Sequence, residues 1–189
     1  MMTSKTPIVM VLISLFLVGC LKKPVQMETI LDSPEHHVAS GFLLIKKDML
    51  NDAEREFVSA LQDDPKYSPA LRGRGLVCAL RKEFKPAFEF MTDAGLYAEQ
   101  KQEKALAHVG FIRLYTMRGG EGWLMEAEKN FYLAISLVKN LPDAYYYLGI
   151  AYKSNKKYAE AASSFKKVLE INKTFVMEAE EKLQNLQAL

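Results

Sequence analysis

Apolar positions recur along the chain with a period of about 34 residues, which is that of helix-hairpin repeats, and small and large side chains keep fixed places within it. In the N-terminal half the recurring pairs are Gly41 and Gly75, Ala53 and Ala87, Phe57 and Met91, and Ala60 and Ala94. The same register returns in Ala127 and Ala161, Phe131 and Phe165, and Ala134 and Val168. A period of this length indicates one helix–turn–helix hairpin per unit. Because a single hairpin cannot bury its apolar face, we expect the hairpins to stack.

The third unit is longer than the others. The spacing from the glycine to the first alanine is the same in the other three units, but it is five residues longer from Gly110 to Ala127. We place the five extra residues between Gly119 and Trp123, in the turn between the helices, and one more before the unit, since Gly110 follows Gly75 by 35. The predicted units are 34–67, 68–102, 103–141 and 142–172. Ser33 and Pro34 form an N-terminal helix signal, so the fold is expected to start there.

The C-terminal segment, residues 173–189, has the pattern of one amphipathic helix. Phe175, Ala179, Leu183 and Leu186 fall on one helical face, with glutamates on the other. A helix with one apolar face is expected at the end of a stack, where it covers the last hairpin and turns its polar face to water.

The residues within the units resemble the tetratricopeptide repeat. In the fourth unit Tyr145, Leu148-Gly149 and Tyr152 stand where that family has Trp, Leu-Gly and Tyr. They are followed at the second-helix positions by Tyr158, Ala161, Phe165 and Val168, and the first unit closes with Asp64-Pro65. The resemblance implies an all-α fold, an α-solenoid of four helix hairpins plus a C-terminal capping helix.

Tetratricopeptide arrays present a concave groove lined by fixed positions of each first helix. Carried over to this chain, the resemblance implies that a partner-binding groove is lined by Val38, Phe42, Ile45, Arg72, Leu76, Leu80, Phe111, Leu114, Tyr115, Tyr146, Ile150 and Lys153. Most of these are apolar, and an apolar stripe of that extent commonly marks a binding surface. A protein or peptide ligand with apolar side chains is expected there. The alternative is a groove filled by tight curvature or by the segment around Met27 to Leu31.

Residues 1–19 read as a secretory signal. An uncharged run from Pro7 to Val18 has the length of a signal's apolar region and is too short to span a bilayer. It ends in Leu17-Val18-Gly19-Cys20, which resembles the lipobox of bacterial lipoproteins. The resemblance implies cleavage after Gly19, acylation at Cys20 and a lipid anchor, with residues 20–33 as a tether. Leu21, where an aspartate would imply retention at the inner membrane, favours the outer membrane facing the periplasm.

Composition and motifs argue against several other functions. The net charge of +2 is too small to indicate a nucleic-acid partner, and two cysteines, Cys20 and Cys78, exclude a disulfide scaffold and a four-cysteine zinc site. The three histidines, His36, His37 and His108, have no clustered partners, and no catalytic or phosphate-binding motif is present. We therefore expect no enzyme, no metal and no cofactor, and Cys78 as a buried packing residue.

These features predict a non-catalytic, membrane-anchored adaptor of the bacterial cell envelope. Its layout of lipobox, short tether and repeats is similar to that of type IV pilotins and outer-membrane assembly lipoproteins, which implies work in a pilus, secretion or outer-membrane machine. Two alternatives remain open. One is a structural scaffold that forms homo-oligomers with its groove filled, and the other is an enzyme that uses the insertion between Gly119 and Trp123.

Overall fold

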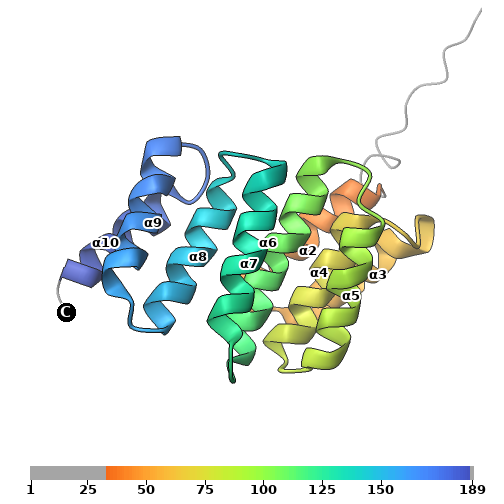
Figure 1. Ribbon diagram of the computed structural model, residues 1–189. Helices are drawn as coiled ribbons and strands as arrows, with labels where there is room; N and C mark the ends of the chain where they lie inside the picture. The colour runs from red at the N-terminus through yellow and green to blue at the C-terminus, as the bar shows by residue number, and fades with distance from the viewer. Residues whose placement is uncertain (1–32, 188–189) are drawn as a thin grey trace, which may run out of the picture.

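The computed structural model describes residues 33–187, and this part of the chain is helical without any β-strand. Consecutive helices run antiparallel (Figure 1). In chain order they are α2 (Pro34–Lys46), α3 (Leu50–Asp63), α4 (Ser68–Leu80), α5 (Phe84–Leu96), α6 (Lys101–Arg118), α7 (Trp123–Leu137), α8 (Pro142–Ser154), α9 (Tyr158–Ile171) and α10 (Val176–Gln187). The predicted all-α solenoid of four hairpins and a capping helix is confirmed.

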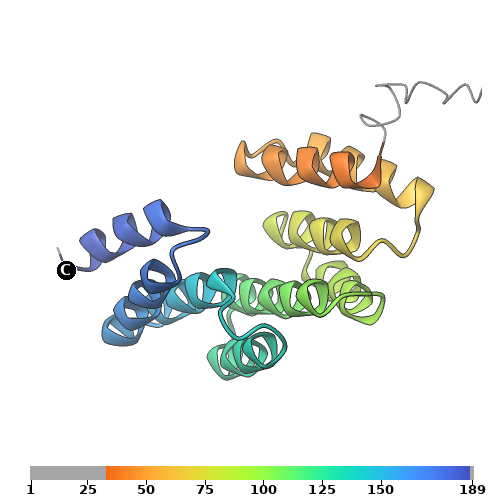
Figure 2. The same cartoon turned by 90° about the horizontal axis from the view of Figure 1, so that it is seen from above.

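The hairpins stack into an arc with an inner and an outer layer of helices (Figure 2). The first helix of each hairpin contacts the first helix of the next, so α2, α4, α6 and α8 form the inner layer. The helices α3, α5, α7 and α9 lie outside them, and α10 closes the row against α9. The arc therefore has a concave side built from the four first helices.

Small and large residues of the period hold the layers together. The recurrent alanines, Ala53 and Ala60 among them, have no exposed surface, which lets the two helices of a hairpin approach closely. The large residue four positions after the first alanine fills the space between hairpins. Phe57 is fully buried, and its ring lies against the backbone of both Gly41 in α2 and Gly73 in α4. Burying a phenylalanine in this way contributes about 1.5–3 kcal/mol.

Three of the four hairpins share one turn. Each of these turns contains one residue in the left-handed backbone conformation. These residues are Asp48, Lys82 and Lys156, with φ angles of 59°, 66° and 62°. The next amide donates back to the carbonyl five residues earlier, as in Met49 N to Leu44 O at 3.0 Å. This is the Schellman arrangement, in which glycine is the residue with the least strain. The third hairpin uses Gly119, Gly120 and Gly122 in its turn, all with positive φ.

Two boundaries differ from the predicted ones. The third unit begins with Lys101, two residues before the predicted start, because α6 has an additional N-terminal stretch. The capping helix begins at Val176, three residues after the predicted start. Phe175 precedes it with φ 63°, so this residue belongs to the turn between α9 and α10. The predicted signal, Cys20 and the tether up to residue 32 lie outside the described residues.

Candidate functional site

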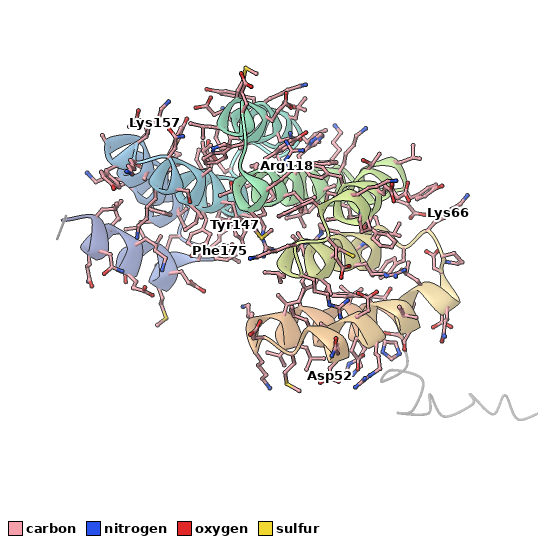
Figure 3. All side chains as sticks on the ribbon, turned by 90° about the horizontal axis from the view of Figure 1, so that it is seen from below. Asp52, Lys66, Arg118, Tyr147, Lys157 and Phe175 are labelled. Carbon is pink, nitrogen blue, oxygen red and sulfur yellow. The ribbon has the colours of Figure 1, made fainter. Side chains whose placement is uncertain are left out.

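A pocket of about 230 Å³ lies on the concave side of the arc. Each of the four inner helices contributes to its lining, and so does the turn between α9 and α10. Tyr147 and Phe175 lie next to each other on this side, between α8 and α10 (Figure 3). We call this the concave pocket. It brings together residues from the first and last hairpins, which lie at opposite ends of the described chain.

The wall formed by α2 and α4 is apolar with one cation. Phe42 and Ile45 come from α2, and Leu76 comes from α4. The guanidinium of Arg72, also on α4, lies over the Phe42 ring at 4.7 Å from its centroid. These four residues were predicted to line the groove, and the structure places all of them at the concave pocket.

The helix α6 forms the floor of the pocket through Leu106, Val109, Gly110 and Arg113. Gly110 gives this helix its register. A Cβ built on Gly110 would meet the sulfur of Met91 at 2.2 Å, and one built on Gly73 would meet the Phe57 ring at 2.2 Å. In both cases the large residue comes from the preceding hairpin. Gly110 is therefore the equivalent of Gly73, two positions earlier in the repeat than Gly75.

This register corrects the predicted groove in the third unit. Phe111, Leu114 and Tyr115 do not line the concave pocket. Leu114 is fully buried, and Phe111 and Tyr115 pack against Phe88 of α5, at 6.0 and 5.0 Å between ring centroids. Arg113 takes the position that Phe42 and Leu76 hold in the first two units. Relative to the second unit, three residues are inserted before Gly110 and three after it, in place of the predicted one and five.

The fourth hairpin and the following turn form the opposite wall. Arg113 lies over the Tyr147 ring at 4.5 Å. Phe175 stacks on Tyr146, with centroids 4.5 Å apart and planes 11° apart, and meets Tyr147 edge-on at 5.7 Å. A positive φ is costly for a bulky residue such as Phe175. The strained turn therefore serves to hold this ring against the two tyrosines at the edge of the pocket.

The charges of the pocket are two guanidiniums and one carboxylate on the inner side, with Lys46 at the exposed rim. Burial, and after it the neighbouring Arg113, lower the pKa of Arg72 to about 10. Burial also raises the pKa of the Asp143 carboxyl, although both arginines oppose that shift. Within the described residues, neither arginine has an ion pair within 4.0 Å or a hydrogen bond. The groove is thus less apolar than predicted.

The remaining predicted groove residues lie in other places. Val38 is buried in the core between the first two hairpins, and Tyr146 lies mainly behind Phe175. Ile150 lines a smaller hollow of about 160 Å³ that adjoins Arg113 and Tyr147. Leu80, with 37% of its surface exposed, and Lys153 line neither hollow. The concave surface is therefore narrower than the predicted stripe.

Leu106, Val109, Arg113, Asp143, Tyr147 and Phe175 were missed from the sequence. One signal for the third unit was present in the chain, in the distance from the large residue of one hairpin to the glycine it contacts in the next. This distance is 16 residues from Phe57 to Gly73 but 19 residues from Met91 to Gly110, which gives a three-residue insertion before Gly110. No comparable signal indicated Phe175, because its contribution depends on the curvature of the whole stack.

Three other residues considered for chemistry, His108, Cys78 and Trp123, pack within the fold. His108 contacts Asn130 at 3.0 Å across α6 and α7, and the side-chain amide of Asn130 donates to the Glu126 carbonyl. Cys78 is a buried free thiol, and burial raises its pKa. Trp123 packs on the core of the third hairpin. No group of three metal-ligating side chains and no helix able to cross a membrane is found within residues 33–187.

Comparisons with known proteins agree with this geometry. The family model described as tetratricopeptide repeat matches residues 142–175, which are the fourth hairpin and Phe175. No curated protein matches the sequence significantly. The thermophilic TPR protein TTC0263 of Thermus thermophilus is 18% identical, with a TM-score of 0.62 over 81% of this chain and 80% of that one.

A second similar structure is a chain of the APC/C hetero-tetramer Cut9-Hcn1. It is 20% identical, with a TM-score of 0.56 over 76% of this chain. Our chain spans only 26% of that chain's length, so the similarity concerns the fold. Solenoids of this kind use their concave surfaces to bind other proteins. Residues 142–175 match the tetratricopeptide repeat, and the described chain as a whole is an α-solenoid whose fold is similar to that of tetratricopeptide-repeat proteins.

Proposed function

We propose that this protein is a non-catalytic adaptor, anchored by lipid in the bacterial cell envelope, which holds a protein partner in the concave pocket. The observation that carries the proposal is the construction of the pocket. The four inner helices and the strained turn between α9 and α10 together line one hollow of about 230 Å³, although α2 and this turn lie at opposite ends of the solenoid.

The size and lining of the pocket fit side chains of a protein better than a free small molecule. Small-molecule sites have volumes of about 300–1,000 Å³ and enclose most of the ligand. The concave pocket is smaller and is continued by the hollow beside Ile150, so that side chains along a helix or strand can enter both. Apolar side chains at regular spacing on a partner would give such a fit.

The anchor and the location rest on the N-terminal sequence. The thiol of Cys20 directly follows Gly19 in a lipobox-like run, and several acyl chains give stable membrane attachment where one does not. Leu21 favours the outer membrane, with the solenoid in the periplasm. The similarity in layout to pilotins and outer-membrane assembly lipoproteins supports a role in assembling an envelope machine.

Site-specific photo-crosslinking in living cells tests the partner proposal. A photoreactive phenylalanine analogue replaces Phe42, Ile45 or Tyr147, and the matched controls carry it at Met125 or Tyr132, which are exposed on α7. We expect crosslinks to one protein from the three pocket positions and none from α7. Crosslinks from α7 alone would contradict the pocket assignment, and crosslinks to a second copy would favour the self-associating scaffold.

Intact mass of the protein from the membrane fraction tests the anchor. We expect a chain that begins at Cys20 and carries acyl groups, and a Cys20→Ala variant that leaves the membrane fraction. An unmodified chain that retains Met1 would refute the anchor while leaving the pocket proposal intact.

A further inference from the structure

The concave pocket holds more positive charge than its own residues neutralise. Arg72 and Arg113 face it from neighbouring inner helices, and Asp143 is the carboxylate that lines it. Asp143 has a hydrogen-bonding contact with the hydroxyl of Thr174 at 3.5 Å, and it forms no ion pair within 4.0 Å of either arginine. Counting these three side chains, the inner pocket carries one net positive charge.

Each of the two guanidiniums is held over an aromatic ring. Arg72 lies over the Phe42 ring and Arg113 over the Tyr147 ring, at 4.7 and 4.5 Å from the ring centroids. Since neither has an ion pair or a hydrogen bond within the described residues, their N–H groups are available to donate. Planar donors held in place lose less rotational freedom on binding than a mobile lysine does.

This arrangement is unfavourable for the free protein. Two like charges share a partly buried place, and burial together with Arg113 disfavours the charged form of Arg72. Apolar side chains at these positions would remove that penalty. The pair is therefore suited to a negative charge brought by another molecule.

We propose that Arg72 and Arg113 together bind the carboxylate of an aspartate or glutamate side chain of the protein partner, while neighbouring apolar side chains of the partner pack on Phe42, Ile45 and Phe175. The proposal rests on the proposed function, since it concerns the partner held in the concave pocket. One carboxylate neutralises the net charge of Arg72, Arg113 and Asp143, and Lys46 adds a further positive charge at the rim. The aromatic and aliphatic walls favour a peptide over a sugar–phosphate backbone.

The test uses random peptides displayed with both ends fused, so that no free terminus is offered. Peptides are selected on the full mature protein in detergent micelles, and one selected peptide is synthesised with blocked ends. Its dissociation constant is then measured by fluorescence anisotropy for the wild-type protein and for Arg72→Gln, Arg113→Gln, the variant that carries both substitutions, and Phe42→Asp. Arg118→Gln is the matched control, because Arg118 is on α6 but lies over Phe88 and Tyr115, outside the pocket.

We expect the selected peptides to share an acidic residue beside apolar ones. Replacing that acid by its amide should weaken binding to the wild-type protein and to Arg118→Gln about tenfold or more, as for other hydrogen bonds to charged groups. The same replacement should have a smaller effect on Arg72→Gln and on Arg113→Gln, each of which keeps one arginine, and should change binding to the variant that carries both substitutions by less than about twofold. Circular dichroism of each variant controls for folding.

Two results separate this inference from the proposed function. Peptides that lose binding to Phe42→Asp but tolerate replacement of their acidic residue would overturn the carboxylate site and leave the adaptor in place. Selection of no peptide, or of peptides that bind Phe42→Asp unchanged, would overturn both. Binding that requires a free C-terminal carboxylate, or binding to phosphatidylglycerol vesicles in place of peptide, would also overturn the side-chain assignment.

Discussion

The contact between Phe57 and Gly73 gives a quantitative test of how the hairpins fit together. The Phe57 ring belongs to the first hairpin and is fully buried. A Cβ added to Gly73 would lie 2.2 Å from Cε1, 2.4 Å from Cζ and 2.5 Å from Cδ1 of that ring. Ordinary contacts are at least 3.4 Å, so the ring or the helix α4 must move by about 1 Å.

We expect the Gly73→Ala substitution to lower the free energy of unfolding by up to about 2 kcal/mol, the difference between an overpacking cost and a helix-propensity gain. Alanine in a helix interior gains about 1 kcal/mol over glycine. Overpacking a core costs about 1–3 kcal/mol, and more where the clashing group is rigid. The same ring atoms also lie close to Gly41, so the ring has little room to move and the overpacking cost exceeds the gain.

Urea denaturation followed by circular dichroism measures this change, and Gly95→Ala is the matched control. A Cβ on Gly95 would have only the Ala107 Cβ within 4 Å, at 3.7 Å, so this variant should be as stable as the wild type or more stable. Phe57→Leu removes the two ring atoms nearest to the new methyl, and the double variant should recover at least about 1 kcal/mol relative to additivity. A Gly73→Ala protein as stable as Gly95→Ala would refute the close fit between the hairpins.

The remaining predictions concern a turn, a charge and a thiol. Lys156→Gly should raise the free energy of unfolding by up to about 1 kcal/mol, because it relieves the positive φ of that turn, and urea denaturation measures the gain. Arg72→Met should stabilise the free protein by about 1 kcal/mol by removing a buried charge, although it removes the proposed carboxylate site. The folded-state pKa of Arg72, about 10, lies below the unfolded value, so the unfolded state holds this proton more tightly. The free energy of unfolding of the wild type should therefore rise relative to that of Arg72→Met as pH rises through about 10. Urea denaturation at several pH values measures this difference. In a Cys20→Ser variant, Cys78 should react with a thiol reagent only on unfolding, because it is buried and its pKa is raised, and the labelling rate in increasing urea checks this.

Much of the fold could be predicted because the signals are local. The alanines and large apolar residues of the period mark the contact between the two helices of one hairpin, and the structure has the predicted hairpins at these positions. Ser33 accepts from the His36 amide at 3.2 Å, as expected of an N-cap, and Pro34 and Pro142 begin their helices. Each of these preferences acts within a few residues, so it can be recognised without knowing the rest of the fold.

The groove was predicted only in its first half, where the repeat is regular. Phe42, Ile45, Arg72 and Leu76 lie at the concave pocket, as the period implied. The prediction for the third unit was wrong because the total insertion can be divided in several ways between the residues before and after its glycine. One plus five residues and three plus three residues give the same spacing from Ala87 to Ala127, and the sequence period alone does not distinguish them.

The sequence by itself determined the helices, their pairing into hairpins and the stacking of the hairpins, since these follow from local capping and from apolar residues at fixed spacing. Only the tertiary structure decided which face of α6 lines the groove. A shift of two residues turns a helix by about 200°, which exchanges Phe111 for Arg113 on the concave side. Contact between Met91 and Gly110 sets that rotation, and it joins different hairpins. The curvature of the stack then brings Phe42 and Phe175 to one pocket. The rotation of α6 adds Arg113 to the predicted Arg72 in that pocket.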